Sequence, residues 1–457
     1  MKQTDTIAAI STAVSNSGIG VIRISGTDAI SIADKCFVSK SENFKLINAK
    51  ANTIHYGFIS DANEIIDEVL VFVFKAPHSF TSEDTIEISC HGGAFVMQQI
   101  LQLVLRCGAR LAEPGEFTKR AFLSGRIDLS QAESIMDLIN SENELILKNS
   151  VNQLRGSLYN EIKDLRNIIL HETAFIEAAI DDPEHYSLDN YSEKLDIIID
   201  ELLNKLNKLY DNADNGIILK EGINTVIIGK PNAGKSSLLN LLAGKERAIV
   251  TDIAGTTRDT LSENINLDGI VLKVTDTAGI RNTSDPIEKI GVELAKNAVK
   301  EADLVIYVLD SSVPLDENDN IILDIIGEKK SIVLLNKCDK PNLIDKEKLN
   351  KELIYINFSA KNGEGLDLLK DTIINLFFKG NISYNNEVFL TNVRQKNLIK
   401  ETINSLSMVK ESIANCMSED FYSIDLYDAY ASLGFIIGEN VSDDLIDKIF
   451  SDFCMGK

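Results

Sequence analysis

The chain has 457 residues, of which 44% are hydrophobic and 25% are charged, and its formal net charge at pH 7 is −23. A chain of this length and hydrophobic content has room for about three domains with ordinary packed cores, which excludes disorder on a large scale. The acidic balance excludes a broad basic surface for nucleic acid, so any contact with RNA needs a local patch or a partner protein.

Cysteine usage and hydropathy indicate the compartment. The six cysteines are scattered without C-x-x-C spacing, so neither a zinc site nor a disulfide framework is predicted. The first residues lack the basic and apolar succession of a signal peptide, and no apolar run approaches the roughly 20 residues that span a bilayer. We therefore expect a soluble cytoplasmic protein in a reducing compartment, with no membrane contact.

The first segment, residues 1–118, alternates short β-type runs with turns. Such runs occupy 20–25, 69–74 and 85–89, and one amphipathic run occupies 95–105. We therefore expect this segment to fold as an α+β domain.

Two helical segments, 119–215 and 381–457, flank an α/β segment at 216–380. Apolar residues recur at every third or fourth position in the first of them, which predicts an amphipathic helix that other helices must cover. This stripe consists of Leu195, Ile198, Leu202, Leu206 and Leu209. The pattern is typical of a domain inserted into a helical bundle, so we expect the helical segments to pack together, with hinges at 214–216 and 379–381.

The α/β segment opens with a phosphate-binding motif. Residues 229–236 read Gly-Lys-Pro-Asn-Ala-Gly-Lys-Ser and fit G-x-x-x-x-G-K-[ST], between a strand-like run at 223–228 and a helix-like run at 236–242. In this motif backbone N–H groups surround the phosphates, Lys235 reaches the β and γ oxygens, and Ser236 ligates Mg²⁺. The predicted phosphate contacts are Asn232, Ala233, Gly234, Lys235, Ser236 and Ser237.

A later motif, Asn336-Lys337-Cys338-Asp339, selects the base. The Asp339 carboxylate can accept hydrogen bonds from the N1–H and the 2-amino group of guanine, which adenine does not offer. Asn336 and the stem of Lys337 are expected to shape the base pocket. Ser359-Ala360-Lys361, after the strand-like run 354–358, is expected to complete it through backbone N–H groups. The site is therefore predicted to prefer guanine.

Between these motifs lie two segments that are typical of nucleotide switches. Thr256-Thr257-Arg258-Asp259 offers Thr257 as a second Mg²⁺ ligand. In Asp276-Thr277-Ala278-Gly279, Asp276 can support the metal and Gly279 can reach the γ-phosphate. The motifs in this order predict a GTP-binding domain.

Further residues give the chain a resemblance over essentially its whole length to the tRNA modification GTPases of the MnmE family, also called TrmE. They are Asp5-Thr6-Ile7, Gly20-Val21-Ile22-Arg23-Ile24-Ser25-Gly26, His91-Gly92-Gly93, Pro114-Gly115-Glu116-Phe117, Arg120-Ala121-Phe122-Leu123 and the final Cys454-Met455-Gly456-Lys457. The resemblance implies a multidomain fold: an α+β folate-binding domain, a helical bundle and an inserted α/β P-loop GTPase (Ras-like G) domain.

The resemblance also implies an activity and partners. It implies a homodimer held by the N-terminal domains, which bind a tetrahydrofolate derivative, 5-formyl- or 5,10-methylene-tetrahydrofolate, as one-carbon donor. FAD enters only through a partner, MnmG, in a heterotetramer. The pair would add an aminomethyl or carboxymethylaminomethyl group to C5 of the wobble uridine of certain tRNAs.

By the same resemblance Arg23, Glu87, Arg126 and Lys457 are folate contacts, since a carboxylate suits the pterin N–H edge and cations suit the carboxylates of folate. Without it, Arg23 and Arg126 would be interpreted as solvated surface residues. Cys454 is expected to take part in the chemistry, and the alternative is a buried structural cysteine.

The residues that would activate hydrolysis also follow from the resemblance. Ile280 stands where many regulatory GTPases have a water-orienting glutamine, so Glu288 is expected to orient the water through a second water. A potassium ion would replace an arginine finger. Its expected ligands are Asn232, Thr251, Ile253 and Thr256, and the whole loop Thr251, Asp252, Ile253, Ala254, Gly255, Thr256 and the following Thr257 would contact the nucleotide.

Two other functions share the GTPase motifs. A GTPase switch in ribosome or RNA assembly would need neither a folate site nor the terminal Cys-Met-Gly-Lys. A folate-dependent aminomethyltransferase with an incidental GTPase would modify tRNA without GTP hydrolysis. Modification by a Glu288→Ala protein would separate these hypotheses.

Overall fold

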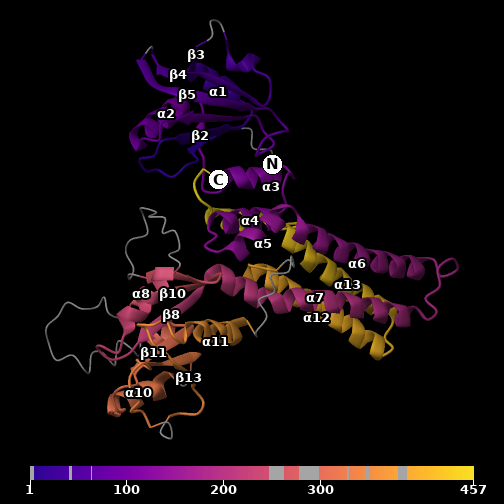
Figure 1. The fold of residues 1–457 in the computed structure, drawn as a ribbon. Helices are drawn as coiled ribbons and strands as arrows, with labels where there is room; N and C mark the ends of the chain where they lie inside the picture. Colours follow the sequence, from indigo (N-terminus) through magenta and orange to yellow (C-terminus); the bar gives the residue numbers. More distant parts are fainter. Residues whose placement is uncertain are drawn as a thin grey trace. The chain divides into compact units, whose positions relative to one another are not determined.

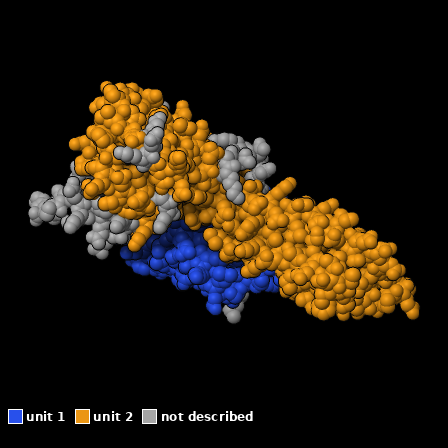
Figure 2. Space-filling model, turned by 90° about the horizontal axis from the view of Figure 1, so that it is seen from below, with its two compact units in different colours: residues 1–136, 153–168, 430–457 blue, residues 137–152, 169–429 orange. Residues whose placement is uncertain are grey.

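The computed structural model describes residues 5–40, 44–62, 64–245, 262–276, 298–326, 329–345, 349–378 and 389–456. The chain forms two compact units, which Figure 2 shows in different colours. Unit 1 contains Met1–Met136, Gln153–Ile168 and Tyr430–Lys457, and unit 2 contains Asp137–Asn152 and Ile169–Ala429. The two termini of the sequence therefore belong to the same unit.

Unit 1 contains a seven-stranded sheet of order β3-β4-β5-β6-β2-β1-β7, in which only the β1–β7 pair is parallel. The strands are β1 (Ile7–Ile10), β2 (Gly20–Ser25), β3 (Phe37–Ser39), β4 (Thr53–Asp61), β5 (Glu64–Phe74), β6 (Thr85–Cys90) and β7 (Arg110–Leu111). Helices α1 (Ala29–Cys36) and α2 (Ala94–Arg106) share one buried apolar cluster with one face of this sheet (Figure 1). This arrangement confirms the predicted α+β fold.

Helices from both ends of the chain complete unit 1. They are α3 (Glu116–Leu123), most of α4 (Leu129–Ile139), the first half of α6 (Ser157–Asp181), the end of α13 (Glu419–Ile437) and α14 (Asp443–Ser451). Phe450 and Phe453 pack with Ala121 and Leu129 in one buried cluster. The C-terminal residues thereby share a buried core with α3 and α4.

In unit 2, α7 (Tyr191–Glu221) and α12 (Val393–Ala414) run antiparallel beside each other (Figure 1). Lys396 pairs with Asp214 at 2.5 Å, and Lys410 pairs with Asp200 at 2.5 Å. The expected packing of helical segments that flank the α/β segment is thus observed. Helix α5 (Glu144–Leu154) belongs to the same unit except for its last two residues.

The predicted hinge at 214–216 is wrong, because α7 continues through it to Glu221. Gly216 serves close packing instead: a Cβ there would lie 2.1 Å from the carbonyl oxygen of Leu390. The helix ends before Gly222, whose φ of 73° ends the helical conformation. The predicted apolar stripe is observed with one change, since Ile199 is buried in place of Ile198. The other predicted hinge, 379–381, lies outside the described residues.

The inserted segment forms a six-stranded sheet of order β13-β12-β11-β8-β10-β9, parallel except for the β9–β10 hairpin. Its strands are β8 (Ile223–Ile228), β9 (Ser262–Leu267), β10 (Ile270–Asp276), β11 (Leu304–Asp310), β12 (Ser331–Asn336) and β13 (Ile354–Asn357). Helices α8 (Lys235–Lys245), α10 (Glu317–Ile326) and α11 (Leu366–Phe378) accompany it. Separate apolar clusters bury the two faces, as in other doubly wound α/β sheets.

Among the described residues, no helix combines the length and the apolar character needed to cross a membrane.

Candidate functional sites

The nucleotide motifs converge at the carboxyl edge of the six-stranded sheet. The phosphate loop follows β8, and Asp310 and Asn336 end the neighbouring strands β11 and β12. In open α/β sheets this edge, at the point where strand order reverses, is where ligands bind. Within the loop the Lys235 ammonium donates to the carbonyl oxygens of Gly229 at 2.6 Å and Lys230 at 2.8 Å. The loop is therefore closed around its own lysine, at the N-terminus of α8.

Asn336 joins the phosphate loop to the predicted base-binding loop at 359–361. Its amide nitrogen donates to Ala233 O at 2.7 Å, and its amide oxygen accepts from Ala360 N at 3.0 Å. The side chain packs directly on Gly234, where a Cβ would lie 2.1 Å from the Asn336 Nδ2. Gly234 also has a φ of 107°, which side chains disfavour. This contact explains why glycine stands at that position.

The exposed Asp339 carboxylate accepts from the Ser359 hydroxyl at 3.0 Å, so the two segments that are predicted to bind the base are aligned. Cys338 N donates to Phe358 O at 3.1 Å and reinforces this alignment. The Lys337 ammonium forms an ion pair with Asp310. Burial alone would raise the pKa of Asp310, but the ion pair and hydrogen bonds outweigh it and hold that pKa below its ordinary value. The stem of Lys337 is thus fixed beside the strand ends.

An acidic pair that the sequence did not single out anchors the start of the phosphate loop. The Lys230 ammonium contacts Asp319 at 2.6 Å and Asp316 at 2.5 Å. Asp319 is buried and also accepts from the Tyr307 hydroxyl at 2.6 Å. No short-range sequence signal marks these acids, because strands β9, β10 and β11 separate them from Lys230 in the chain.

Several predicted residues lie outside the described part of the chain. They are Thr251, Asp252, Ile253, Ala254, Gly255, Thr256, Thr257, Thr277, Ala278, Gly279, Glu288 and Lys457. Asp276 is the last residue of β10. Asn232 is described, exposed and has a φ of 63°, while Ser236 and Ser237 lie in the first turn of α8.

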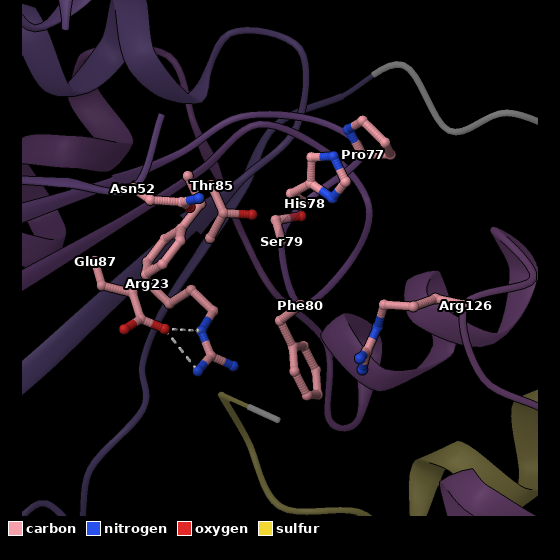
Figure 3. Close-up of a pocket in the computed structure, with 10 residues that line it drawn as sticks. Arg23, Asn52, Pro77, His78, Ser79, Phe80, Thr85, Glu87 and Arg126 are labelled. Carbon is pink, nitrogen blue, oxygen red and sulfur yellow. Dashed lines mark hydrogen bonds and ion pairs between the residues drawn. The ribbon is translucent and has the colours of Figure 1, made fainter. Parts of the chain in front are cut away.

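Unit 1 contains a separate pocket, which brings Arg23, Glu87 and Arg126 together (Figure 3). Its volume is about 620 Å³. Arg23 and Glu87 are register partners on β2 and β6, and Arg126 precedes α4. The lining residues are Arg23, Asn52, Phe74, Pro77, His78, Ser79, Phe80, Thr85, Glu87 and Arg126.

Arg23 is held on several sides. Its Nε and Nη2 atoms both lie 2.8 Å from Glu87 Oε1. Its guanidinium carbon lies 5.0 Å from the ring centroid of Phe80 and 5.5 Å from that of Phe117. Its remaining nitrogen, Nη1, is buried and has no hydrogen-bond partner within the described residues. A buried guanidinium N–H without a partner is costly, and an anionic or carbonyl-bearing ligand would satisfy it.

Phe80 lies between the two arginines (Figure 3). The guanidinium carbon of Arg126 is 4.7 Å from the Phe80 ring centroid. Burial lowers the pKa of Arg126 below its ordinary value. The Phe80 ring therefore has one guanidinium on each side, and these contacts order both arginines. A cation–π contact of this kind contributes about 0.5–1 kcal/mol at an exposed site.

The loop that carries Phe80 is tied to the protein core. The Ser25 hydroxyl lies 2.6 Å from the Thr81 hydroxyl and donates to Glu83 at 2.7 Å. Buried Arg120 contacts the Glu83 carboxylate at 3.2 Å and Glu116 at 2.9 Å. The pocket wall is therefore positioned by residues of β2 and α3.

The C-terminal tail lies against β1, which pairs with the strand that carries Arg23. The Ser11 hydroxyl donates to Gly456 O at 3.1 Å, and Gly115 N donates to Cys454 O at 3.3 Å. The Cys454 side chain belongs to an exposed residue. The alternative interpretation of Cys454 as a buried structural cysteine is therefore wrong.

Comparison with known proteins identifies the family of the chain. The model of the MnmE helical domain matches residues 129–454, and that of the GTP-binding protein TrmE N-terminus matches residues 6–126. The tRNA modification GTPase MnmE of Lachnoclostridium phytofermentans is 54% identical over 459 residues, with 100% of both chains covered. The chain belongs to the MnmE family of tRNA modification GTPases. The predicted family is thereby confirmed.

Other MnmE relatives agree. The protein of Acetivibrio thermocellus is 48% identical, with 100% of both chains covered, and that of Finegoldia magna is 46% identical over 99% of this chain and 100% of its own. Among solved structures, the G domain of the T. maritima FeoB iron transporter is 27% identical, with 34% of this chain and 97% of that one covered and a TM-score of 0.25. At that TM-score we draw no conclusion from the likeness.

Some site residues of this MnmE-family GTPase had no sequence signal. Phe80, Asn52 and the 77–79 stretch line the pocket, yet nothing in their local pattern differs from an ordinary loop. Phe80 can be recognised as a site residue only from its position beside Arg23 and Arg126 in space, which requires the tertiary fold.

Proposed function

We propose that this MnmE-family GTPase uses GTP hydrolysis to drive addition of an aminomethyl or carboxymethylaminomethyl group to C5 of the wobble uridine of certain tRNAs. The one-carbon unit would come from 5-formyl- or 5,10-methylene-tetrahydrofolate bound in unit 1. The observation that supports this proposal is the convergence of Arg23, Glu87 and Arg126 on one pocket. A GTPase that acted only as a timing switch would have no use for such a pocket.

The pocket suits folate chemically. The Glu87 carboxylate, already paired with Arg23, retains lone pairs that can accept from the pterin N–H edge. The unpaired Nη1 of Arg23 and the guanidinium of Arg126 are donors for carbonyl and carboxylate oxygens. Phe74 adds an aromatic face for the flat rings of such a ligand, while Phe80 orders the two arginines.

The tail and Lys457 would complete this pocket. The contacts of Gly456 with Ser11 and of Cys454 with Gly115 hold the tail against β1. From there Lys457 is proposed to contact the ligand, and the exposed Cys454 thiol is proposed to take part in the chemistry.

For GTP, we propose that Asp339 recognises guanine and that Lys235 and the phosphate-loop N–H groups hold the phosphates. Ser236, at the start of α8, would ligate Mg²⁺ together with Thr257. Asn232 offers a side-chain carbonyl oxygen for K⁺, with Thr251, Ile253 and Thr256 as further ligands. Bound K⁺ would neutralise charge that develops in the transition state, and Glu288 would orient the attacking water.

The net charge of the chain bears on how it would bind tRNA. A net charge of −23 disfavours independent tRNA binding, so we propose a heterotetramer with MnmG, which would bring FAD and share the tRNA contact.

An exposed apolar patch bears on the proposed homodimer. The sheet face opposite α1 and α2 exposes Ile54, Tyr56 and Leu70, by 58%, 41% and 42%. Tyr56 and Leu70 are register partners, so these residues form one patch. A second copy of the N-terminal domain would cover it in the proposed homodimer.

The first experiment is nucleoside analysis of tRNA from cells that lack this gene, complemented with wild type, Cys454→Ser or Arg23→Ala. We expect wild type to restore 5-substituted wobble uridine and Arg23→Ala to fail. Loss with Cys454→Ser would support a chemical role for the thiol. Unchanged tRNA in the deletion strain would contradict the proposal and favour an assembly switch.

Two biochemical tests address hydrolysis. We expect Glu288→Ala to stop both GTP turnover and tRNA modification, and modification without turnover would instead favour an aminomethyltransferase with an incidental GTPase. We expect replacement of K⁺ by Na⁺ to slow GTP hydrolysis by about tenfold or more. An unchanged rate in Na⁺ would contradict the potassium ligands proposed above.

A further inference from the structure

The β9–β10 hairpin of the nucleotide-binding sheet is joined directly to the segment that begins α5. Asn264 Nδ2 donates to Glu142 Oε1 at 3.0 Å, and Asn266 Nδ2 donates to the Glu142 carbonyl oxygen at 3.3 Å. The Asn266 amide oxygen accepts from Gly269 N at 2.8 Å, which orients the amide toward Glu142. A single residue before α5 thus receives hydrogen bonds from two positions on one hairpin strand.

Apolar packing makes this junction stiff. Ile146 of α5 is only 2% exposed and belongs to the same buried cluster as Ile265 of β9 and Leu272 of β10. Leu145 packs against this cluster as well. Close-packed interiors transmit displacement and do not absorb it. The start of α5 must therefore move with the hairpin or break its packing.

The same helix is tied to the helical part of unit 2. Asn143 Nδ2 donates to Leu219 O near the end of α7 at 3.0 Å, and Asn143 Oδ1 accepts from Ile146 N at 2.8 Å. Asn149 Nδ2 donates to Phe389 O, ahead of α12, at 3.0 Å. Helix α5 therefore bridges the hairpin and the antiparallel α7–α12 pair.

The hairpin has a particular place in the nucleotide-binding sheet. It begins at Ser262, shortly after the predicted switch motif 256–259, and it ends at Asp276, the first residue of the other predicted switch motif. β10 also pairs with β8, whose end opens the phosphate loop. The hairpin therefore lies in the chain between the two predicted switch motifs and beside the strand that opens the phosphate loop.

We propose that the contact of Glu142 with Asn264 and Asn266 is a joint that transmits the nucleotide state of the GTPase sheet to α5 and the helical segments. Asn264, Asn266 and Glu142 lie outside the predicted nucleotide motifs in the sequence, so their proposed role is one of positioning. The joint gives GTP binding and hydrolysis a physical route out of the nucleotide site. It depends on the GTPase activity of the family and not on the proposed folate chemistry.

The test is hydrogen–deuterium exchange of α5 peptides with GDP and with a non-hydrolysable GTP analogue. In the wild-type protein we expect exchange in α5 to differ between the two nucleotides. In Asn264→Ala/Asn266→Ala we expect that difference to shrink by at least about threefold while nucleotide affinity stays within about twofold. Glu142→Ala removes only one of the two bonds and should give an intermediate loss.

A matched control removes a contact between the same hairpin and a different helix, α11. Asp268, in the hairpin turn, pairs with Lys370 of α11 at 2.8 Å, so Asp268→Ala should leave the α5 difference unchanged. The proposal is overturned if wild-type α5 does not respond to the nucleotide, or if the double variant keeps the full response. An equal loss in Asp268→Ala would also overturn it, because the effect would then belong to the hairpin in general. Should the double variant fail to fold, the surface variant Glu142→Ala carries the same test.

Discussion

The two sites of this protein are built in opposite ways. The nucleotide site consists of a loop of consecutive residues after β8, closed by one buried side chain, Asn336, and by backbone groups. The pocket of unit 1 consists of side chains from β2, β6, the segment after α3 and a loop between strands. A site made of backbone depends on glycines and chain geometry, whereas a site made of side chains depends on tertiary contacts. The first should fail abruptly on substitution and the second by degrees.

The largest effect is expected for Gly234→Ala. The new Cβ would lie 2.1 Å from Asn336 Nδ2 and would force a side chain into a φ of 107°. We expect GTP affinity to fall by more than about a thousandfold, since strain and lost hydrogen bonds add. Titration with a fluorescent guanine nucleotide measures this, with circular dichroism to show that the fold persists.

Gly244→Ala is the matched control for that variant. Gly244 lies in α8, and a Cβ there meets nothing within 4 Å. Alanine in an exposed helix should keep nucleotide affinity and stabilise the helix by about 0.5–1 kcal/mol. Near-normal GTP binding by Gly234→Ala would contradict the contrast between a backbone-built and a side-chain-built site.

In unit 1, Arg23→Ala should weaken binding of 5-formyl-tetrahydrofolate by about a hundredfold. The substitution removes the ion pair with Glu87 and the free Nη1 donor together. Isothermal titration calorimetry measures the affinity. Arg106→Ala, which removes an exposed ion pair with Asp61 on the same domain, should bind as wild type does. Equal affinities of Arg23→Ala and wild type would remove the basis for the folate site.

A smaller effect should follow Phe80→Leu. Leucine keeps the apolar volume but loses the ring that both Arg23 and Arg126 approach, at 5.0 and 4.7 Å. The two cation–π contacts are worth about 0.5–1 kcal/mol each, so folate affinity should fall by about tenfold. The same calorimetry checks this, and GTP affinity serves as an internal reference that must not change. A loss as large as that of Arg23→Ala would mean that the ring itself contacts the ligand.

The smallest effect concerns acid stability of unit 1. Burial alone would raise the pKa of Glu116, but its contacts with Arg110, Glu113 N and Arg120 outweigh burial and hold that pKa below 4.5. A depressed carboxyl pKa stabilises the folded state above the unfolded pKa, and this contribution is lost as pH falls below 4.5. We expect Glu116→Gln to unfold at a lower denaturant concentration than wild type at pH 7, and by a smaller margin at pH 3. An equal difference between the unfolding midpoints of Glu116→Gln and wild type at pH 7 and at pH 3 would contradict this prediction.

Local patterns predicted many elements correctly. The strands at 20–25 and 223–228 and the helix that opens at the phosphate loop are observed, because alternation of apolar residues and the P-loop itself are short-range signals. The predicted hinge at 214–216 was also based on a short-range signal, and it was wrong. An Asn-Gly pair favours a turn, but Gly216 is required where α7 passes the Leu390 carbonyl.

The sequence by itself predicted the nucleotide motifs, because phosphate and base recognition use fixed spacings after a strand, and it determined the family through motifs along the whole chain. Only the tertiary structure decided that Arg23, Glu87 and Arg126 line one pocket with Phe80 between the arginines. It also decided that Glu142 receives the β9–β10 hairpin. These contacts join residues far apart in the chain, and strand order, register and close packing bring them together.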